Sequence, residues 1–184
     1  PVSLRKGMEQ LIRREIEHAQ QGRGGSIKAK MNSLVDPGII ALLYEASQAG
    51  VTIQLIIRGM CSLYPGLEGI SDNIKVVSII GRFLEHSRIF WFNNGGEAEV
   101  FIGSADLMPR NLDRRVEAVV PIEEPELRAQ LERLLERYLS DNRGAWDMQP
   151  DGSFIQRNPE GEERNSQLQL IDDWKGSALL QPNR

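Results

Sequence analysis

Apolar residues at helical intervals predict three helices within residues 1–140. Residues 3–21 carry such a stripe, and the glycine-rich break that follows ends the helix. Asp36-Pro37-Gly38 is a typical helix start, so a second helix is expected over Ile39–Ala49. A leucine-rich stripe predicts the third helix over Glu124–Leu139. Each would bury one face against a neighbouring layer.

Alternating or continuous apolar runs between these helices predict strands. Residues 26–32 alternate between polar and apolar side chains, whereas Val51–Ile57 is almost wholly apolar, as in a buried central strand. Asn93–Gly96 lies between two alternating segments and has the composition of a hairpin turn. The predicted strands are residues 26–32, Val51–Ile57, Lys75–Ile80, His86–Phe92, Ala98–Ile102 and Arg115–Val120. Strands interleaved with helices, together with a hairpin, predict an α/β fold with a mixed sheet.

The remaining segments are polar or poor in apolar residues. Residues 58–73 and the arginine-rich stretch Ser104–Arg114 are expected to be connections. Further on, Asp147–Asn165 is expected to form a loop that can include one edge strand, and Leu168–Leu179 a last helix. The chain is therefore expected to comprise a domain over residues 1–140 and a C-terminal extension, residues 141–184, that packs on it without an assigned function.

Composition and charge exclude several classes of protein. The 184 residues include 26 acidic and 22 basic side chains, giving a net charge of −4. This suits one globular domain and argues against a general nucleic-acid or membrane-surface binder. The apolar runs are shorter than the roughly 18 residues of a membrane helix, and a single cysteine, Cys61, excludes an internal disulfide. Because the chain starts at Pro1 without a signal peptide, we expect it to be part of a longer polypeptide.

His86 is the centre of the candidate chemistry. It lies two residues before Arg88 at the start of a predicted strand, so the two side chains would share a face. Arg58 follows the buried strand at its carboxyl end, where open α/β sheets usually bind ligands. Guanidinium groups bind phosphoryl oxygens bidentately, and an imidazole can donate, accept or transfer a proton near pH 7. With Arg115 and Glu117 on a further strand face, the set indicates phosphate handling.

Other candidate residues have simpler explanations. His18 lies off the apolar stripe of its helix and is expected in solvent. The basic face formed by Lys28, Lys30 and Asn32 could be an ordinary exposed sheet face. Cys61 has no histidine near it in the sequence and is expected to be structural. A lone histidine at a strand start is also most often structural, so the spacing around His86 has to carry the argument.

That spacing resembles one half of the phospholipase D pattern. The phospholipase D pattern consists of H-x-K, then G-S-x-N, then a downstream acid. In this chain the corresponding motifs are His86-x-Arg88, Gly103-Ser104-x-Asp106 and Arg115-x-Glu117. Arg88 replaces the lysine and Asp106 the asparagine, and one histidine motif is present where a phospholipase D site needs two. These departures argue against lipid hydrolysis. A phosphodiesterase or nuclease half-site still stays open, as does a non-catalytic module that binds anions or assembles with other domains.

Longer blocks resemble the C-terminal catalytic domain of bacterial polyphosphate kinase. The blocks that carry this resemblance are Gly24–Asp36, Ile57–Leu63, Leu67–Ile74, Phe83–Arg88 and Ser104–Glu117. They follow one another in the family's order within residues 3–140, and the match is weak after residue 141. The resemblance implies a phospholipase-D-like mixed β-sheet flanked by helices.

The resemblance also implies a reaction. The family reversibly moves the terminal phosphate of ATP onto polyphosphate through a phosphohistidine. By this likeness Arg58 and His86 contact the nucleotide phosphates, with His86 as proton donor or phosphate ligand during transfer. The phosphohistidine and the residues associated with Mg²⁺ belong to preceding domains, so no metal ligand is expected here. We expect the fragment alone to fold but to be inactive.

Further expectations concern weaker contributors and the full-length enzyme. Arg88, Arg115 and Lys30 are expected to add phosphate contacts, because strand faces would present them beside the main pair. Glu117 would orient Arg115 or fix the imidazole tautomer of His86. The full-length enzyme is expected to be a bacterial cytoplasmic homo-oligomer, either free or membrane-associated. It would use ATP, ADP and polyphosphate and bind no nucleic acid.

Overall fold

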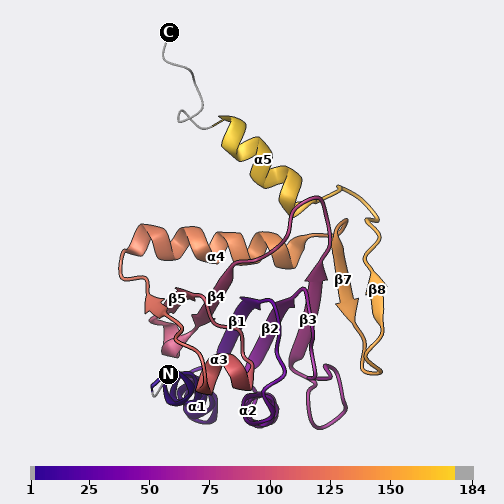
Figure 1. Ribbon diagram of the computed structural model, residues 1–184. Helices are drawn as coiled ribbons and strands as arrows, with labels where there is room; N and C mark the ends of the chain where they lie inside the picture. The colour runs from indigo at the N-terminus through magenta and orange to yellow at the C-terminus, as the bar shows by residue number, and fades with distance from the viewer. Residues whose placement is uncertain (1–2, 177–184) are drawn as a thin grey trace.

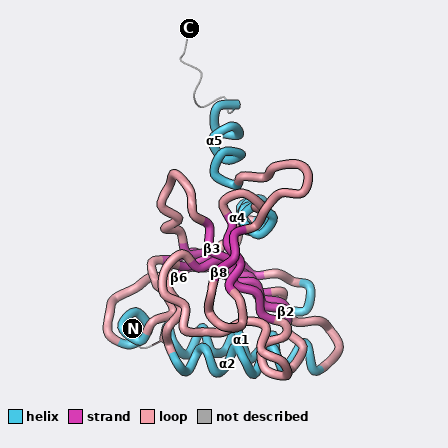
Figure 2. Tube along the Cα trace, turned by 90° about the vertical axis from the view of Figure 1, so that its right-hand side faces the viewer, coloured by secondary structure: helices cyan, strands magenta, loops and turns pink. Residues whose placement is uncertain are grey.

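The computed structural model describes residues 3–176 as three layers built on one sheet (Figure 1, Figure 2). Helices α1 and α2 cover one face of the sheet and α4 covers the other. The helices are α1 (Leu4–Gln20), α2 (Pro37–Gln48), α3 (Pro109–Asp113), α4 (Pro125–Ser140) and α5 (Ser166–Gly176), with a short 3₁₀ turn, η1 (Asn94–Gly96). The strands are β1 (Ser26–Met31), β2 (Thr52–Ile57), β3 (Ile74–Ile79), β4 (Arg88–Phe92), β5 (Glu99–Gly103), β6 (Val119–Pro121), β7 (Ala145–Met148) and β8 (Phe154–Gln156).

Strand directions bring the polar loops to one edge of the sheet. The eight strands run in the order β6-β5-β4-β1-β2-β3-β7-β8. β1, β2 and β3 are parallel neighbours, β4 runs antiparallel to β1, and β5 antiparallel to β4. The carboxyl ends of β1, β2, β3 and β5 therefore lie at the same edge as the start of β4. We call this the site edge; it comprises residues 32–34, 58–62, 80–87 and 104–107.

Alternation along β1 decides which layer each of its side chains meets. Its apolar residues pack with α1 and α2 in the larger core. Lys28 and Lys30 point to the opposite face, where Lys28 pairs with Glu136 of α4 and the Lys30 ammonium lies 5.0 Å from the centroid of the Tyr138 ring. The expectation of an ordinary exposed face is wrong, because α4 covers this face of the sheet and leaves Lys30 only 1% exposed.

The predicted start of the second helix is confirmed. The carboxylate of Asp36 accepts a hydrogen bond from the backbone N–H of Ile39 at 3.0 Å, which caps α2. Arg5 of α1 donates to the same carboxylate at 2.6 and 2.9 Å. The hydrogen bonds from Arg5 lower the pKa of Asp36 and outweigh the opposing effect of burial. The start of α2 is thereby fixed against α1.

Three local predictions around the site edge are wrong. The strand expected to begin at His86 begins at Arg88, so His86 precedes β4. Its neighbours Glu85 and Ser87 are bonded to the buried Lys30 and not to a neighbouring strand. α3 occupies part of the segment expected to be a connection, and it begins at Pro109, a residue suited to the first turn of a helix. Residues 115–117 are irregular, since only Val119–Pro121 pairs with β5.

The hairpin is confirmed, and its turn buries a residue that was expected in solvent. The turn contains η1, in which Asn94 and Gly95 adopt positive φ values of 48° and 65°. His18 of α1 is buried beneath this turn, with its Nε2 3.3 Å from Oδ1 of Asn94. A Cβ on Gly95 would lie 3.1 Å from the imidazole of His18, so a glycine lets the turn approach the ring. The expectation that His18 is exposed is wrong.

The C-terminal segment extends the same sheet. β7 pairs antiparallel with β3, and β8 pairs antiparallel with β7. β8 lies at the edge of the sheet and is the edge strand expected within Asp147–Asn165, whereas β7, which begins at Ala145, was not predicted. α5 follows and lies on the α4 side of the sheet in Figure 1. The predicted last helix is confirmed as far as Gly176, and its expected end at residues 177–179 lies outside the described residues.

Candidate active site

Asp106 organises the cationic side chains at the site edge. It is 7% exposed, and its Oδ1 accepts from the backbone N–H of Asn32 at 2.7 Å. Arg88 binds the same carboxylate with two nitrogens, Nε at 3.3 Å and Nη2 at 3.1 Å. Burial opposes ionisation of Asp106, but the hydrogen bonds from Arg88 and Asn32 outweigh it and lower its pKa. Asp106 is therefore a fixed anion that orients Arg88.

Asn32 carries the same network to Arg58. Its side-chain nitrogen donates to both oxygens of Asp106 at 3.1 Å, and its Oδ1 accepts from Nε of Arg58 at 2.6 Å. Arg58 thus uses its Nε–H to bind Asn32, and its terminal nitrogens remain available to another partner. The site edge therefore places two guanidinium groups beside one carboxylate, which leaves an excess positive charge.

His86 is exposed and lies against Arg88. Nη1 of Arg88 is 3.1 Å from Nδ1 and 3.4 Å from Nε2 of the imidazole, and it also donates to the backbone carbonyl of His86 at 3.0 Å. Arg88 therefore connects His86 to Asp106. The structure brings His86, Arg88 and Arg58 into one network, through Asp106 and Asn32. We call these five residues the cationic network.

Lys30 belongs to a different network, in the interior. Its ammonium donates to Oγ of Ser87 at 2.8 Å and lies 3.1 Å from Oε2 of Glu85. Burial lowers the pKa of Lys30 more than the carboxylate of Glu85 raises it. Burial, followed by the nearby Glu85 carboxylate, raises the pKa of Tyr138. With its ammonium enclosed by these groups, Lys30 is not placed to contact a phosphate.

Arg115 lies apart from the cationic network. Its Nε is 3.4 Å from Glu117, whose carboxylate also accepts from Ser104 and from Asn111. Within residues 3–176, no hydrogen bond joins Glu117 to His86. Arg88 occupies the position beside the imidazole that was considered for Glu117, because residues 115–117 do not continue the sheet. Of the two roles considered for Glu117, the contact with Arg115 supports orienting Arg115 and not fixing the tautomer of His86.

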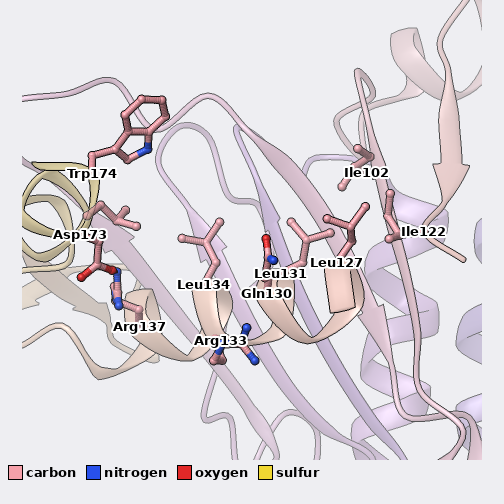
Figure 3. A pocket seen from close by; sticks show the side chains of 11 residues that line it. Ile102, Ile122, Leu127, Gln130, Leu131, Arg133, Leu134, Arg137, Asp173 and Trp174 are labelled. Atoms are coloured by element: carbon pink, nitrogen blue, oxygen red, sulfur yellow. The ribbon is translucent and has the colours of Figure 1, made fainter. Parts of the chain in front are cut away.

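One hollow on the surface adjoins the cationic network, and another lies away from it. A pocket of about 260 Å³ adjoins Arg58, and its lining residues are Arg58, Gly59, Ser78, Ile80, Trp146 and Phe154. A second pocket, of about 520 Å³, runs along α4 (Figure 3), with Leu127 and Leu131 beside Ile102 and Ile122 at one end and Arg137 beside Asp173 of α5 at the other. No residue of the cationic network lines the second pocket. The hollow beside Arg58 therefore adjoins the candidate chemistry.

The described part of the chain contains neither a metal-binding cluster nor a membrane-spanning helix. No group of three or more His, Cys, Asp and Glu side chains within residues 3–176 is arranged to hold a metal ion. None of the helices described is both long and apolar enough to cross a bilayer.

Several participants were missed by sequence reasoning. Glu85 precedes His86 directly and could have been noticed as an acid beside the candidate site. Gln167 of α5 donates to Glu85 at 2.7 Å, and no pattern in the sequence points to it. Asp106 was noted only as a departure from a motif, whereas the structure makes it the carboxylate that orients Arg88.

A family comparison decides the assignment of the chain. The family model described as "Polyphosphate kinase C-terminal domain 2" matches residues 1–168. The chain belongs to this polyphosphate kinase family. It is 76% identical over 176 residues to the polyphosphate kinase of Parasynechococcus marenigrum (strain WH8102), and 57% identical over 171 residues to that of Synechocystis sp.. These alignments cover 95% and 93% of the chain but 25% and 24% of the relatives, so the chain spans about a quarter of their length.

Solved structures agree on the fold. The crystal structure of polyphosphate kinase from Porphyromonas gingivalis superposes with a TM-score of 0.90 and 40% identity, over 95% of this chain and 27% of that one. NucT from Helicobacter pylori superposes with a TM-score of 0.54 and 15% identity, over 76% and 91% of the two chains. A phospholipase D family member, Nuc from Salmonella typhimurium, gives 0.53 and 17%, over 73% and 88%. The expected phospholipase-D-like fold and the resemblance to polyphosphate kinase are confirmed.

Proposed function

We propose that this chain supplies one side of an active site that reversibly transfers the terminal phosphate of ATP to polyphosphate. The observation that carries the proposal is the cationic network at the open edge of the sheet, in a chain of the polyphosphate kinase family. Phosphoryl transfer depends mainly on positioning and on stabilising charge on the moving phosphoryl group. Two oriented guanidinium groups beside an exposed imidazole meet that requirement.

Each residue has a role in this proposal. Arg58 and Arg88 bind phosphoryl oxygens with the N–H donors that Asn32, Asp106 and His86 leave free. His86 contacts the transferred phosphate as a donor or moves a proton to it. Arg115, more than half exposed, binds a more distant phosphate of the chain or nucleotide. Lys30 takes part only by holding the segment that carries His86.

The other side of the site would come from preceding domains of the same polypeptide. Large apolar side chains are exposed around the cationic network, as expected of a surface that another domain covers. Those at or beside the site edge are Met60, Ile80, Phe83, Leu84 and Val116. The preceding domains would supply the phosphohistidine and hold any Mg²⁺. The chain alone would therefore not transfer phosphate. The complete enzyme is proposed to be a cytoplasmic homo-oligomer.

The test uses the complete enzyme with His86→Ala, incubated with γ-labelled ATP and Mg²⁺. We expect synthesis of labelled polymer to fall about 100-fold or more, while acid-labile phosphoprotein still forms because the nucleophile lies in another domain. His18→Gln is the matched control, since His18 is the chain's other histidine and lies beneath the hairpin turn. Near-normal polymer synthesis by a folded His86→Ala enzyme would contradict the proposal.

A further inference from the structure

The segment that carries His86 has few hydrogen bonds of its own. Residues 81–87 contain no helix or strand. Among the backbone-to-backbone hydrogen bonds of the described chain outside regular elements, none has a partner in this segment. Its conformation must therefore be set by side chains from elsewhere. We call residues 81–87 the His86 loop.

Gln167 of α5 supplies part of that restraint. It is 5% exposed, and its side-chain amide pairs with the backbone of Phe83 in both directions. Oε1 of Gln167 accepts from the N–H of Phe83 at 2.9 Å, and Nε2 donates to the carbonyl of Phe83 at 2.9 Å. Nε2 also donates to Oε1 of Glu85 at 2.7 Å. One side chain thus replaces the backbone partner that a neighbouring strand would have provided.

The inner side of the loop is fixed at alternate residues. Glu85 pairs with Lys30, and Ser87 accepts from the same ammonium. Both neighbours of His86 are thus bonded to the buried ammonium of Lys30, whereas His86 itself is exposed and meets Arg88.

The position of Gln167 is itself fixed by α4. Asp141, at the end of α4, accepts from both the backbone N–H and the Oγ of Ser166 at 2.7 Å. The start of α5 packs closely on the loop, because a Cβ on Gly81 would lie 2.5 Å from Oε1 of Gln167. A continuous set of contacts thus runs from Asp141 through Gln167 to the segment that holds His86.

We propose that Gln167 is a positioning residue of the transfer reaction, which holds the His86 loop so that His86 faces the cationic network. This inference rests on the proposed function and gives the C-terminal segment a part in it. Gln167 touches no reacting atom. It acts through Phe83 and Glu85 on the placement of the imidazole, and displacements of about 1 Å in such groups can lower a rate about 100-fold.

The first measurement compares Gln167→Met with Gln169→Met in the complete enzyme. Methionine keeps the length of the side chain and removes its hydrogen bonds. Gln169 lies on the same helix, and its side chain makes no hydrogen bond to the loop. We expect Gln167→Met to lower kcat about 10-fold or more with a smaller change in KM for ATP, and Gln169→Met to leave both near wild type. Hydrogen–deuterium exchange of the peptide over residues 80–90 should accelerate only in Gln167→Met. Unchanged exchange in that variant would overturn the proposal.

A double-mutant cycle with His86→Ala separates positioning from general loss of structure. If Gln167 acts through His86, then adding Gln167→Met to His86→Ala should cost little further activity. An equal loss of activity in both backgrounds would overturn the inference while leaving the proposed function standing. Normal polymer synthesis by His86→Ala alone would refute the proposed function, and this inference with it.

Discussion

Two networks meet at His86, and they differ in charge and in burial. The cationic network combines two guanidinium groups with one carboxylate and opens to solvent at His86. The second network pairs Lys30 with Glu85, which are 1% and 8% exposed, and adds Gln167 from α5. One network carries an excess charge that an anionic ligand can meet, whereas the other is internally neutralised.

This difference shows how one edge of a sheet can hold both a binding surface and its support. A buried ion pair is costly unless both partners are satisfied, and it adds little affinity for anything outside. Its value here is geometrical, because Glu85 and Ser87 flank His86 along the chain. The exposed network, in contrast, would gain most of its energy only when a phosphate arrives.

The largest effect is expected from Glu85→Ala. Removing this carboxylate leaves the Lys30 ammonium buried without its partner, which should lower the free energy of unfolding by about 3–5 kcal/mol. Urea unfolding of the 184-residue chain measures this change. The double variant Lys30→Met with Glu85→Gln removes both charges and should recover most of the loss. A Glu85→Ala chain as stable as wild type would show that the buried pair does not hold the loop.

A smaller, pH-dependent effect is expected from Asp106→Asn. The pKa of Asp106 is lowered in the folded state from its ordinary value of 3.8. As the pH falls below 3.8, the unfolded state therefore binds a proton at Asp106 more readily than the folded state does. The stabilisation that ionised Asp106 gives the folded state is fully present above pH 3.8 and is lost as the pH falls through the lower pKa of the folded state. At pH 7 we expect Asp106→Asn to cost about 1–3 kcal/mol. The unfolding free energies of variant and wild type should converge below pH 4, and a gap that stays constant down to pH 2.5 would contradict this account.

The smallest effect is expected from Glu136→Gln. This substitution breaks the ion pair between Glu136 and Lys28, which lies on the same face of β1 as Lys30. Glu136 is more than half exposed, and Lys28 keeps Glu132 at 3.6 Å and the Trp91 ring at 4.4 Å. Exposed pairs contribute about 0–1 kcal/mol, so the unfolding free energy should change by less than about 1 kcal/mol. A loss as large as that of Glu85→Ala would remove the contrast between buried and exposed pairs.

Local patterns predicted the elements, but not the contacts between distant ones. The alternation of residues 26–32 and the capping sequence at Asp36 predicted a strand and a helix start from neighbouring residues alone. The burial of Lys30 depends on α4, which lies about a hundred residues later and covers that face. Gln167 and Phe83 are separated by 84 positions, so no short-range signal connects them. Arg58 and His86 were identified by family resemblance and strand position, whereas the Asp106 network required the three-dimensional structure.

The sheet ends in two very short outer strands, and this affects how the domain behaves in a crowded solution. β6 and β8 have three residues each, and Pro121 in β6 lacks a backbone donor. Short, interrupted outer strands give other chains little backbone to pair with, which limits aggregation through edge-to-edge contact. Without β7 and β8, the six-residue and largely buried β3 would become an open edge. The last strands therefore also protect the protein against self-association into extended sheets.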